Sequence, residues 1–313
     1  MNSAPESTPP RTPVSVIGLG NLGRALAAAL VERGHPTTVW NRTAGRADDL
    51  VARGARRADT VGEALEAGEL VIVCLLDQDA ARAVLAQGAG ALAGRAVVNI
   101  TSGTPEPVRE LADWAAGHGA DYLAGAVYAV PQTIGTPEAF VLYSGSRAVF
   151  EAHRDTLDAV LGGGTFTGAD PALASVHDMA VLSGMYGMFA GFFHGVALAG
   201  TEGISAADIT RHMTRWLTEA AAALPGFAAE IDAGDYTTET STLDINAWGL
   251  GAILTASRAR GIGDALLAPL QELFRREVDA GHGAASLART VESLPSHGRA
   301  PAWGHPRPKA GGR

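Results

Sequence analysis

The apolar stretch SVHDMAVLSGMYGMFAGFFHGVALAG, residues 175–200, organises the rest of this chain. Asp178 is its only carboxylate, and His177 and His194 are its only other groups that titrate near neutral pH. A run this apolar is long enough to span a membrane. We favour a helix buried on all sides in a soluble protein, because the chain has no second apolar span and a carboxylate is costly near lipid.

Three glycines leave one side of this helix bare. Gly187, Gly191 and Gly195 are four residues apart, so they lie on one helix face. A face without side chains lets another helix approach closely. The stretch follows a nucleotide-binding region and precedes a helical one. It is therefore expected to join two domains, with Asp178 at its start, within reach of a cofactor.

The N-terminal region begins with a dinucleotide-binding pattern. A strand is predicted over 14–18, a helix over 22–33 and a second strand over 36–40, with Gly18-Leu19-Gly20-Asn21-Leu22-Gly23 after the first strand. In this pattern the first glycine makes the turn, the second lets the backbone approach a pyrophosphate, and the third packs the helix against the strand. We expect the pyrophosphate at the helix N-terminus. The residues expected to bind it are Gly18, Leu19, Gly20, Asn21 and Leu22.

The end of the second strand indicates which cofactor binds. Proteins that prefer NAD usually carry an acidic residue there, which holds the ribose hydroxyls. This chain has Asn41, Arg42 and Thr43, with Arg46 one turn later. An acid would repel a 2′-phosphate, whereas arginines bind it through planar, charge-assisted hydrogen bonds. We therefore predict NADPH; the alternative is that Arg42 and Arg46 are only solvated surface charges.

Strands and helices alternate up to about residue 170. Further strands are predicted over 70–76, 95–100, 121–130, 139–144 and 165–167, and the first of these is apolar throughout, as parallel sheets require. Ligands of such sheets bind beyond the carboxyl ends of the strands. The residues expected to face the cofactor there are Leu75, Leu76, Asn99, Thr101 and Ser102. Thr101 and Ser102 also suit the capping of a helix that begins at Pro105, and both roles can coexist.

The C-terminal region loses its β character. Helices are expected over 206–224, 227–234, 243–260 and 266–280. A region so rich in helices is too elongated to bury its apolar residues alone, which with the glycine face predicts an intertwined homodimer. The expected fold is an α/β Rossmann domain (13–170) joined by a long interdomain helix (171–200) to an all-α C-terminal dimerisation domain (201–295). Disordered tails are expected over 1–12 and 296–313.

Composition excludes several other classes of protein. The net charge of −9 argues against a nucleic-acid partner. Cys74, the single cysteine, lies in the apolar run 70–76 and is expected to be a buried strand residue, and we expect no metal site. Residues 1–12 are polar and rich in proline, without the apolar segment of a signal peptide, so we expect a cytoplasmic protein.

Asp178 is the candidate catalytic residue. Burial raises the pKa of a carboxyl group, so Asp178 could donate a proton near neutral pH. In its ionised form it would stabilise a positive charge on a substrate. Both roles suit a substrate that becomes an iminium ion, but a buried aspartate can also be purely structural.

Six segments resemble the β-hydroxyacid dehydrogenase superfamily and, within it, the imine reductases. They are VIGLGNLG (16–23), WNRTAGRADDL (40–50), VVNITSGTP (97–105), YLAGAVYAVPQTIGTPEAFVLYSGS (122–146), HDMAVLSGMYG (177–187) and AGHGAASLARTVESL (280–294). The hydroxyacid dehydrogenases carry a catalytic lysine near the start of the long helix and an asparagine one turn later. This chain has Asp178 and Leu182 at those places, and imine reductases replace the lysine with Asp or Tyr.

The resemblance implies reduction of imines or iminium ions by hydride transfer from NADPH, with Asp178 anchoring or protonating the nitrogen. It implies that Tyr186 lines the substrate pocket and that Trp248 closes the pocket from the second subunit, although Trp248 also suits plain core packing. Ser102 stands where reductive aminases carry an asparagine near the substrate nitrogen, and His177 stands where an aromatic residue is expected. We therefore expect reduction of preformed cyclic imines rather than the joining of an amine to a ketone.

Two other functions remain open at this point. One is a 3-hydroxyacid dehydrogenase-type oxidoreductase with an altered acid, against which the missing lysine speaks. The other is a non-catalytic NADPH-binding protein on the same fold. Fold alone does not decide among the three.

Overall fold

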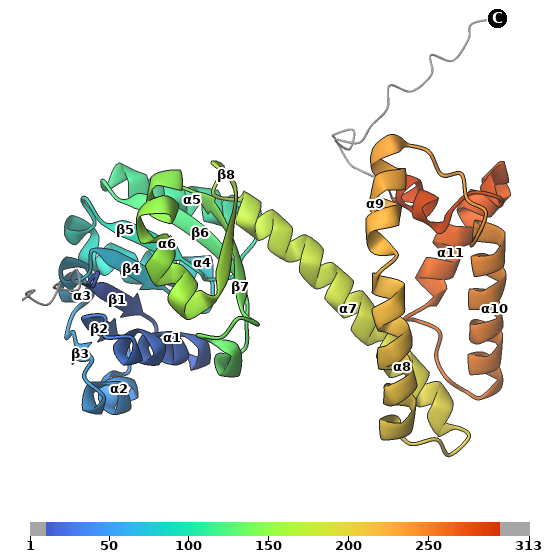
Figure 1. Cartoon of the computed structure of the whole chain (residues 1–313), viewed down its shortest axis with the longest axis horizontal. Helices are drawn as coiled ribbons and strands as arrows, with labels where there is room; N and C mark the ends of the chain where they lie inside the picture. Colours follow the sequence, from blue (N-terminus) through green and yellow to red (C-terminus); the bar gives the residue numbers. More distant parts are fainter. Residues whose placement is uncertain (1–10, 295–313) are drawn as a thin grey trace, which may run out of the picture. The chain divides into compact units, whose positions relative to one another are not determined.

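The computed structural model describes residues 11–294. Apart from Arg11 and Thr12, the two predicted tails lie outside the described residues. The chain divides into two compact units that meet between Ser183 and Gly184, and each is described here by itself (Figure 1).

The first unit is built on one eight-stranded sheet in the order β3-β2-β1-β4-β5-β6-β7-β8. The strands are β1 (Val14–Ile17), β2 (Thr37–Trp40), β3 (Arg56–Arg57), β4 (Leu70–Val73), β5 (Ala96–Asn99), β6 (Asp121–Tyr128), β7 (Phe140–Gly145) and β8 (Gly163–Gly168). Neighbouring strands are parallel except β6 and β7, which run antiparallel. The short edge strand β3 was not expected, because two exposed arginines give no apolar signal.

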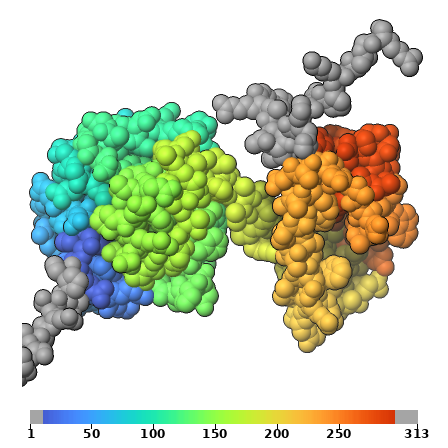
Figure 2. All heavy atoms as spheres, turned by 45° about the horizontal axis from the view of Figure 1, so that its top comes forward, coloured from blue at the N-terminus to red at the C-terminus, as the bar shows by residue number. Residues whose placement is uncertain are grey.

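Helices cover both faces of this sheet. They are α1 (Asn21–Glu32), α2 (Asp48–Ala52), α3 (Val61–Ala67), α4 (Gln78–Leu85), α5 (Pro105–Gly117) and α6 (Arg147–Leu161). Alternate residues of each central strand point to opposite faces, so one core contains α1, α2 and α6 and the other contains α3, α4 and α5. In Figure 2, α6 in light green covers one of these faces. Two buried faces explain why the central strands are apolar throughout.

Helix α7 (Leu173–Gly200) starts in the first unit and continues into the second. The expectation that it is buried on all sides is wrong for the single chain, since Tyr186, Met188, Phe189 and Phe193 are exposed. By length and composition alone α7 could cross a membrane. A Cβ atom added at Gly187 or Gly191 would meet no atom of the chain within 4 Å. The bare face expected from the glycine spacing is therefore open along this part of the helix.

The second unit is helical. Besides the end of α7 it contains α8 (Ala206–Ala221), α9 (Leu224–Ala233), α10 (Leu243–Ala259) and α11 (Ala268–Glu277). Pro225 lies in the first turn of α9 rather than between two helices, because a proline is tolerated where the amide would be unpaired anyway. Together the two units confirm the predicted combination of an α/β sheet domain with an all-helical one.

The last described segment folds back onto this unit. Ser286 N–H donates to the carbonyl of Tyr236 (2.8 Å), and Leu243 N–H donates to the carbonyl of Ala285 (2.9 Å). The buried carboxylate of Glu277 accepts hydrogen bonds from Arg289 and Ser293. The segment AGHGAASLARTVESL therefore carries one side of each of these contacts, and its partners lie earlier in the second unit.

Candidate active site

The glycine-rich turn lies between β1 and α1, and two of its glycines are sterically required. Gly18 has φ +99°, and a Cβ atom there would lie 2.2 Å from the carbonyl oxygen of Cys74. A Cβ atom at Gly23 would lie 2.0 Å from the carbonyl oxygen of Gly18. Gly20 has open space at that position and caps α1 without a side-chain hydrogen bond. The first amides of α1 are thus left free for an anionic ligand.

Asn41 braces this turn from the end of β2. Its Oδ1 accepts from the amide of Leu19 (3.0 Å), and its Nδ2 donates to the carbonyl of Thr43 (3.0 Å). Arg46 donates to the carbonyl of Leu19 at 3.3 Å. Within residues 11–294, neither Arg42 nor Arg46 forms an ion pair with a carboxylate. Two guanidinium groups next to the turn are therefore available to an anion.

A cavity of about 360 Å³ adjoins these residues. Its lining residues come from the end of β2, from the segment after β3 and from α4. They are Trp40, Asn41, Arg42, Ala44, Ala58, Asp59, Ala80, Ala83, Val84 and Gln87. Asp59 is the single carboxylate among them, and it faces Arg57 at 4.0 Å. The cavity has the size and the apolar walls of a small-molecule subsite, with Arg42 as its cation.

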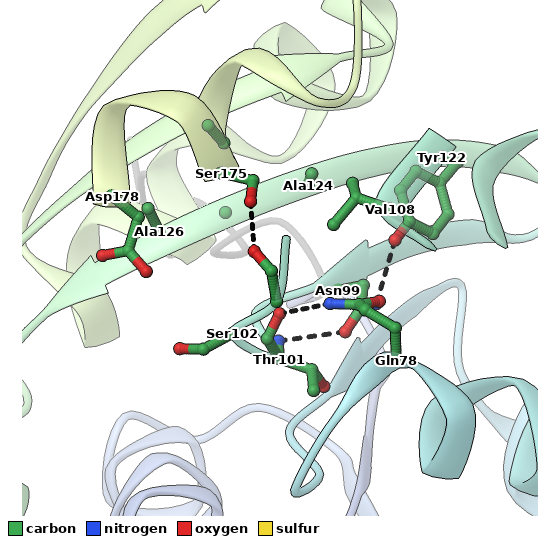
Figure 3. A pocket seen from close by; sticks show the side chains of 13 residues that line it. Gln78, Asn99, Thr101, Ser102, Val108, Tyr122, Ala124, Ala126, Ser175 and Asp178 are labelled. Atoms are coloured by element: carbon green, nitrogen blue, oxygen red, sulfur yellow. Dashed lines mark hydrogen bonds between the residues drawn. The ribbon is translucent and has the colours of Figure 1, made fainter. Parts of the chain in front are cut away.

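A buried polar network fixes the loop after β5 (Figure 3). Asn99 Nδ2 donates to Gln78 Oε1 (2.8 Å) and to the hydroxyl of Tyr122 (2.9 Å). Asn99 Oδ1 accepts from the amide of Thr101 (3.0 Å), and Gln78 donates to the Thr101 carbonyl (2.6 Å). The hydroxyl of Thr101 in turn accepts from the amide of Leu75 (3.1 Å). These bonds give partners to the buried side chains of Gln78, Asn99 and Thr101, which restricts the conformation of the loop.

This network includes two residues that the sequence placed at the cofactor. Asn99 and Thr101 were expected to face the cofactor, but they are 2% and 5% exposed and their polar atoms are bound to the protein. They support the surface on which a ligand would lie. Leu75 is half-buried beside Gly18, and Leu76 is exposed. The side chains in this set that are accessible for direct contact with a cofactor are thus those of Leu75, Leu76 and the exposed Ser102.

The start of α7 is held at two points, one on the sheet and one on the loop after β5. Ser144 of β7 accepts from the amide of Ala174 (2.8 Å) and donates to the carbonyl of Pro171 (2.8 Å). Ser175 donates to the carbonyl of Gly103, in the loop that the network fixes. Asp178 therefore lies at a defined distance from the ends of β5 and β6.

Asp178 lines a cavity of about 10 Å³ together with Ser102 and residues of β6. Figure 3 shows its side chain projecting from α7 next to Ala126, with Ser102 on the loop after β5 below it. The side chain is 6% exposed. Burial raises the pKa of this carboxyl, while the hydroxyl of Tyr128 acts in the opposite direction. Asp178 can thus exchange a proton or present a negative charge where the strands end.

Tyr186 and Trp248 lie in the second unit, where both are exposed, and their role at the substrate remains a prediction. His177 is exposed on α7. Across residues 11–294 there is no cluster of three or more His, Cys, Asp and Glu residues that could hold a metal.

Sequence reasoning missed four residues of the site: Gln78, Tyr122, Tyr128 and Ser175. Gln78 and Ser175 carry no local signal, because each acts on a loop far away in the sequence. The two tyrosines had a usable signal. Tyr122, Ala124, Ala126 and Tyr128 alternate along one strand and so share a face.

Comparisons with known proteins agree along nearly the whole chain. Residues 13–168 match the family described as NAD binding domain of 6-phosphogluconate dehydrogenase, and residues 170–296 match the family described as NADPH-dependent reductive aminase-like, C-terminal domain. An NADPH-dependent reductive aminase of Aspergillus oryzae is 38% identical over 283 residues, which are 89% of this chain and 96% of that protein.

Solved structures give the same result. The reductive aminase of Aspergillus terreus, in complex with NADPH and ethyl levulinate, is 39% identical, with a TM-score of 0.85 over 90% of this chain and 99% of that one. An imine reductase of Streptomyces aurantiacus is 36% identical, with a TM-score of 0.86 and the same coverage.

Proposed function

Because the chain belongs to the family of NADPH-dependent reductive aminases and imine reductases, we propose that Asp178 is its catalytic residue and that cyclic imines are its preferred substrates. The protein is an NADPH-dependent oxidoreductase that reduces imines to amines. The observation that carries the proposal for Asp178 is its position: a buried carboxylate beside the ends of β5 and β6, on a helix start that is fixed to both the sheet and a loop.

The residues around the turn fit NADPH. The open position at Gly20 and the uncapped N-terminus of α1 suit the pyrophosphate. Arg42 and Arg46, without carboxylate partners among the described residues, suit the 2′-phosphate. Bound NADPH supplies the hydride.

The protein's own part in the reaction is to position and polarise the imine. Asp178 would lie next to the substrate nitrogen, where its carboxylate stabilises the iminium cation or its carboxylic acid donates the proton. Ser102 on the fixed loop would contact the same substrate. By the resemblance to the imine reductases, Tyr186 would line the substrate pocket and Trp248 would close it from a second copy of the chain.

Lysine-dependent oxidation of hydroxy acids has no support in this chain. Its only lysine is Lys309, which lies outside the described residues and far along the sequence from the start of α7. Asp178 stands where such an enzyme would carry its lysine.

We also propose a homodimer and a cytoplasmic location. The apolar face of α7 is exposed in the single chain. Next to it, residues of α7 and α8 line a groove of about 650 Å³ whose walls are mostly apolar; they include Phe189, Phe193 and Leu217. A second copy of the chain would cover this surface. The family match accords with a soluble enzyme.

The decisive experiment is NADPH consumption with 2-methyl-1-pyrroline as substrate, comparing the wild type with Asp178→Ala. We expect turnover to fall by at least about 100-fold in the variant, because a positioned acid or charge contributes that much. NADPH binding, followed by fluorescence, should not change. The wild type should use NADH far less well.

An exposed aspartate on α6 provides the matched control. Asp155→Ala removes a carboxylate from the surface of the same unit and should leave turnover unchanged. Full turnover in Asp178→Ala would exclude Asp178 as the catalytic residue. Comparable affinity for NADPH and NADH would contradict the role of the two arginines.

A further inference from the structure

One face of strand β6 leads from the buried network to Asp178. Tyr122, Ala124 and Ala126 of this strand all line the small cavity that Asp178 also lines. Figure 3 shows them in this order, with Ala126 nearest to Asp178. Because side chains alternate along a strand, Tyr128 continues the same face beyond Ala126. The small side chains of Ala124 and Ala126 leave room for the cavity, and Tyr122 and Tyr128 lie at the two ends of this face of the strand.

The ring of Tyr128 is held in place by the neighbouring strand. Tyr128 pairs with Phe140 in the antiparallel register of β6 and β7, and the two rings stack with centroids 4.5 Å apart and planes 15° apart. Such a contact between directly opposed aromatic residues restricts both side chains. The direction in which the hydroxyl points is therefore fixed by the sheet.

The hydroxyl of Tyr128 is a buried donor that faces Asp178. Its oxygen is buried, and within residues 11–294 no partner meets full hydrogen-bond geometry. A buried phenol normally has an acceptor. Burial raises the pKa of Tyr128 to about 12, and the nearby carboxylate of Asp178 adds a smaller effect in the same direction. The phenol consequently keeps its proton throughout the working range of an enzyme.

Asp178 experiences the reverse of this interaction. Burial is the larger effect and raises its pKa, and the hydroxyl of Tyr128 lowers it. The two opposing effects on the pKa of this carboxyl are thus burial and the hydroxyl of Tyr128. Tyr128 therefore favours the anion of Asp178.

We propose that Tyr128 is a positioning residue for imine reduction: its phenolic O–H donates to the carboxylate of Asp178, fixes its orientation and favours its ionised form next to the substrate nitrogen. The inference rests on the proposed role of Asp178.

The test is the variant Tyr128→Phe, which removes the hydroxyl and keeps the ring that stacks on Phe140. In the pH profile of kcat for 2-methyl-1-pyrroline, the ionisation that disappears in Asp178→Asn should move upward by about one pH unit, the usual effect of one hydrogen bond to a charged group. The direction is the same whether Asp178 acts as an acid or as an anion, because loss of the donor disfavours the anion in both cases.

Tyr143→Phe is the matched control. Tyr143 is also a buried tyrosine whose hydroxyl has no partner among the described residues, and it lies on the neighbouring strand β7. This variant should keep the wild-type profile. An unchanged profile in Tyr128→Phe, or an equal shift in Tyr143→Phe, would overturn the proposal.

A second measurement does not depend on turnover. The carboxyl ¹³C signals of aspartate-labelled protein, with Asp178 assigned through Asp178→Asn, report its titration directly in the full-length protein. An upward shift in Tyr128→Phe supports the contact even if the wild type fails to reduce imines, which would instead refute the proposed substrate class. Identical titration in both proteins overturns the contact.

Discussion

Asp178 combines burial with a neighbouring tyrosine hydroxyl, and the two have opposite effects on its carboxyl. Its pKa is raised by burial and lowered by the hydroxyl of Tyr128. A carboxyl with a raised pKa favours the fold when protonated and disfavours it when ionised. The same property that makes Asp178 useful in catalysis therefore costs stability at neutral pH.

Asp178→Asn should stabilise the protein at pH 7 by about 1 kcal/mol, a typical size for one substitution, because it removes a charge whose burial is unfavourable. The folded protein binds the Asp178 proton more tightly than the unfolded chain does, so the contribution of Asp178 to stability falls as pH rises from the unfolded pKa, about 3.9, through the raised folded pKa. Urea unfolding of both proteins between about pH 4 and pH 8 measures the effect. The difference should vanish at the acid end, and a less stable variant at pH 7 would contradict the sign.

At the scale of elements, the C-terminal segment is held by one buried ion pair. Glu277, at the end of α11, is 7% exposed and accepts from Arg289 Nε (2.9 Å) and from Ser293. Arg289 also donates to His282 Nε2 (2.9 Å) and lies 5.4 Å from the centre of the Tyr236 ring. The guanidinium of Arg289 thus contacts Glu277 at the end of α11, His282 in the turn after it, and Tyr236, which follows α9.

Arg289→Met should destabilise the second unit by about 2–4 kcal/mol, because it leaves the carboxylate of Glu277 buried without its partner. The double variant Arg289→Met/Glu277→Gln should recover part of this loss, since it removes the unpaired charge. Urea unfolding of the full chain and hydrogen exchange of residues 286–293 are the two measurements.

Arg276→Met provides the control for this prediction. Arg276 pairs with Glu272 on the exposed side of the same helix at 3.6 Å, and surface pairs contribute less than about 1 kcal/mol. If the two arginine variants lose equal stability, the buried pair is not what holds the segment.

At the scale of the whole molecule, the single chain leaves apolar surface uncovered. The exposed aromatic residues include Tyr186, Phe193, Trp216 and Trp248, all in the second unit. Gly187 and Gly191 are open to the outside. Contiguous apolar surface of this kind usually marks an interface, which is the basis for the proposed homodimer.

Gly191→Leu should weaken the dimer without harming the single chain, because a Cβ atom there meets nothing within 4 Å. Light scattering coupled to gel filtration should give twice the 32.1 kDa chain mass for the wild type and a larger monomer fraction for the variant. Gly117→Leu, an equally open glycine at the end of α5, should remain dimeric. A monomeric wild type at micromolar concentration would refute the dimer.

The sequence by itself determined the features that depend on near neighbours. The turn at Gly18–Gly23, the basic residues after β2 and the place of Asp178 on a helix start follow from steric and chemical requirements within a few residues. The sheet domain and the helices beyond residue 200 followed from periodicity. The motifs of the C-terminal segment identified the family before any contact was known.

Only the tertiary structure decided which distant residues meet. Parallel connections bring Gln78, Asn99 and Tyr122 together across three segments, and this buries the side chain of Asn99 in a polar network. The antiparallel pairing of β6 with β7 fixed the ring of Tyr128, which faces Asp178 some fifty residues later. Burial depends on what packs against a residue, so neither the pKa of Asp178 nor the exposure of α7 could be predicted from the local sequence. These long-range contacts determine the surroundings of Asp178, which the dinucleotide-binding pattern alone does not specify.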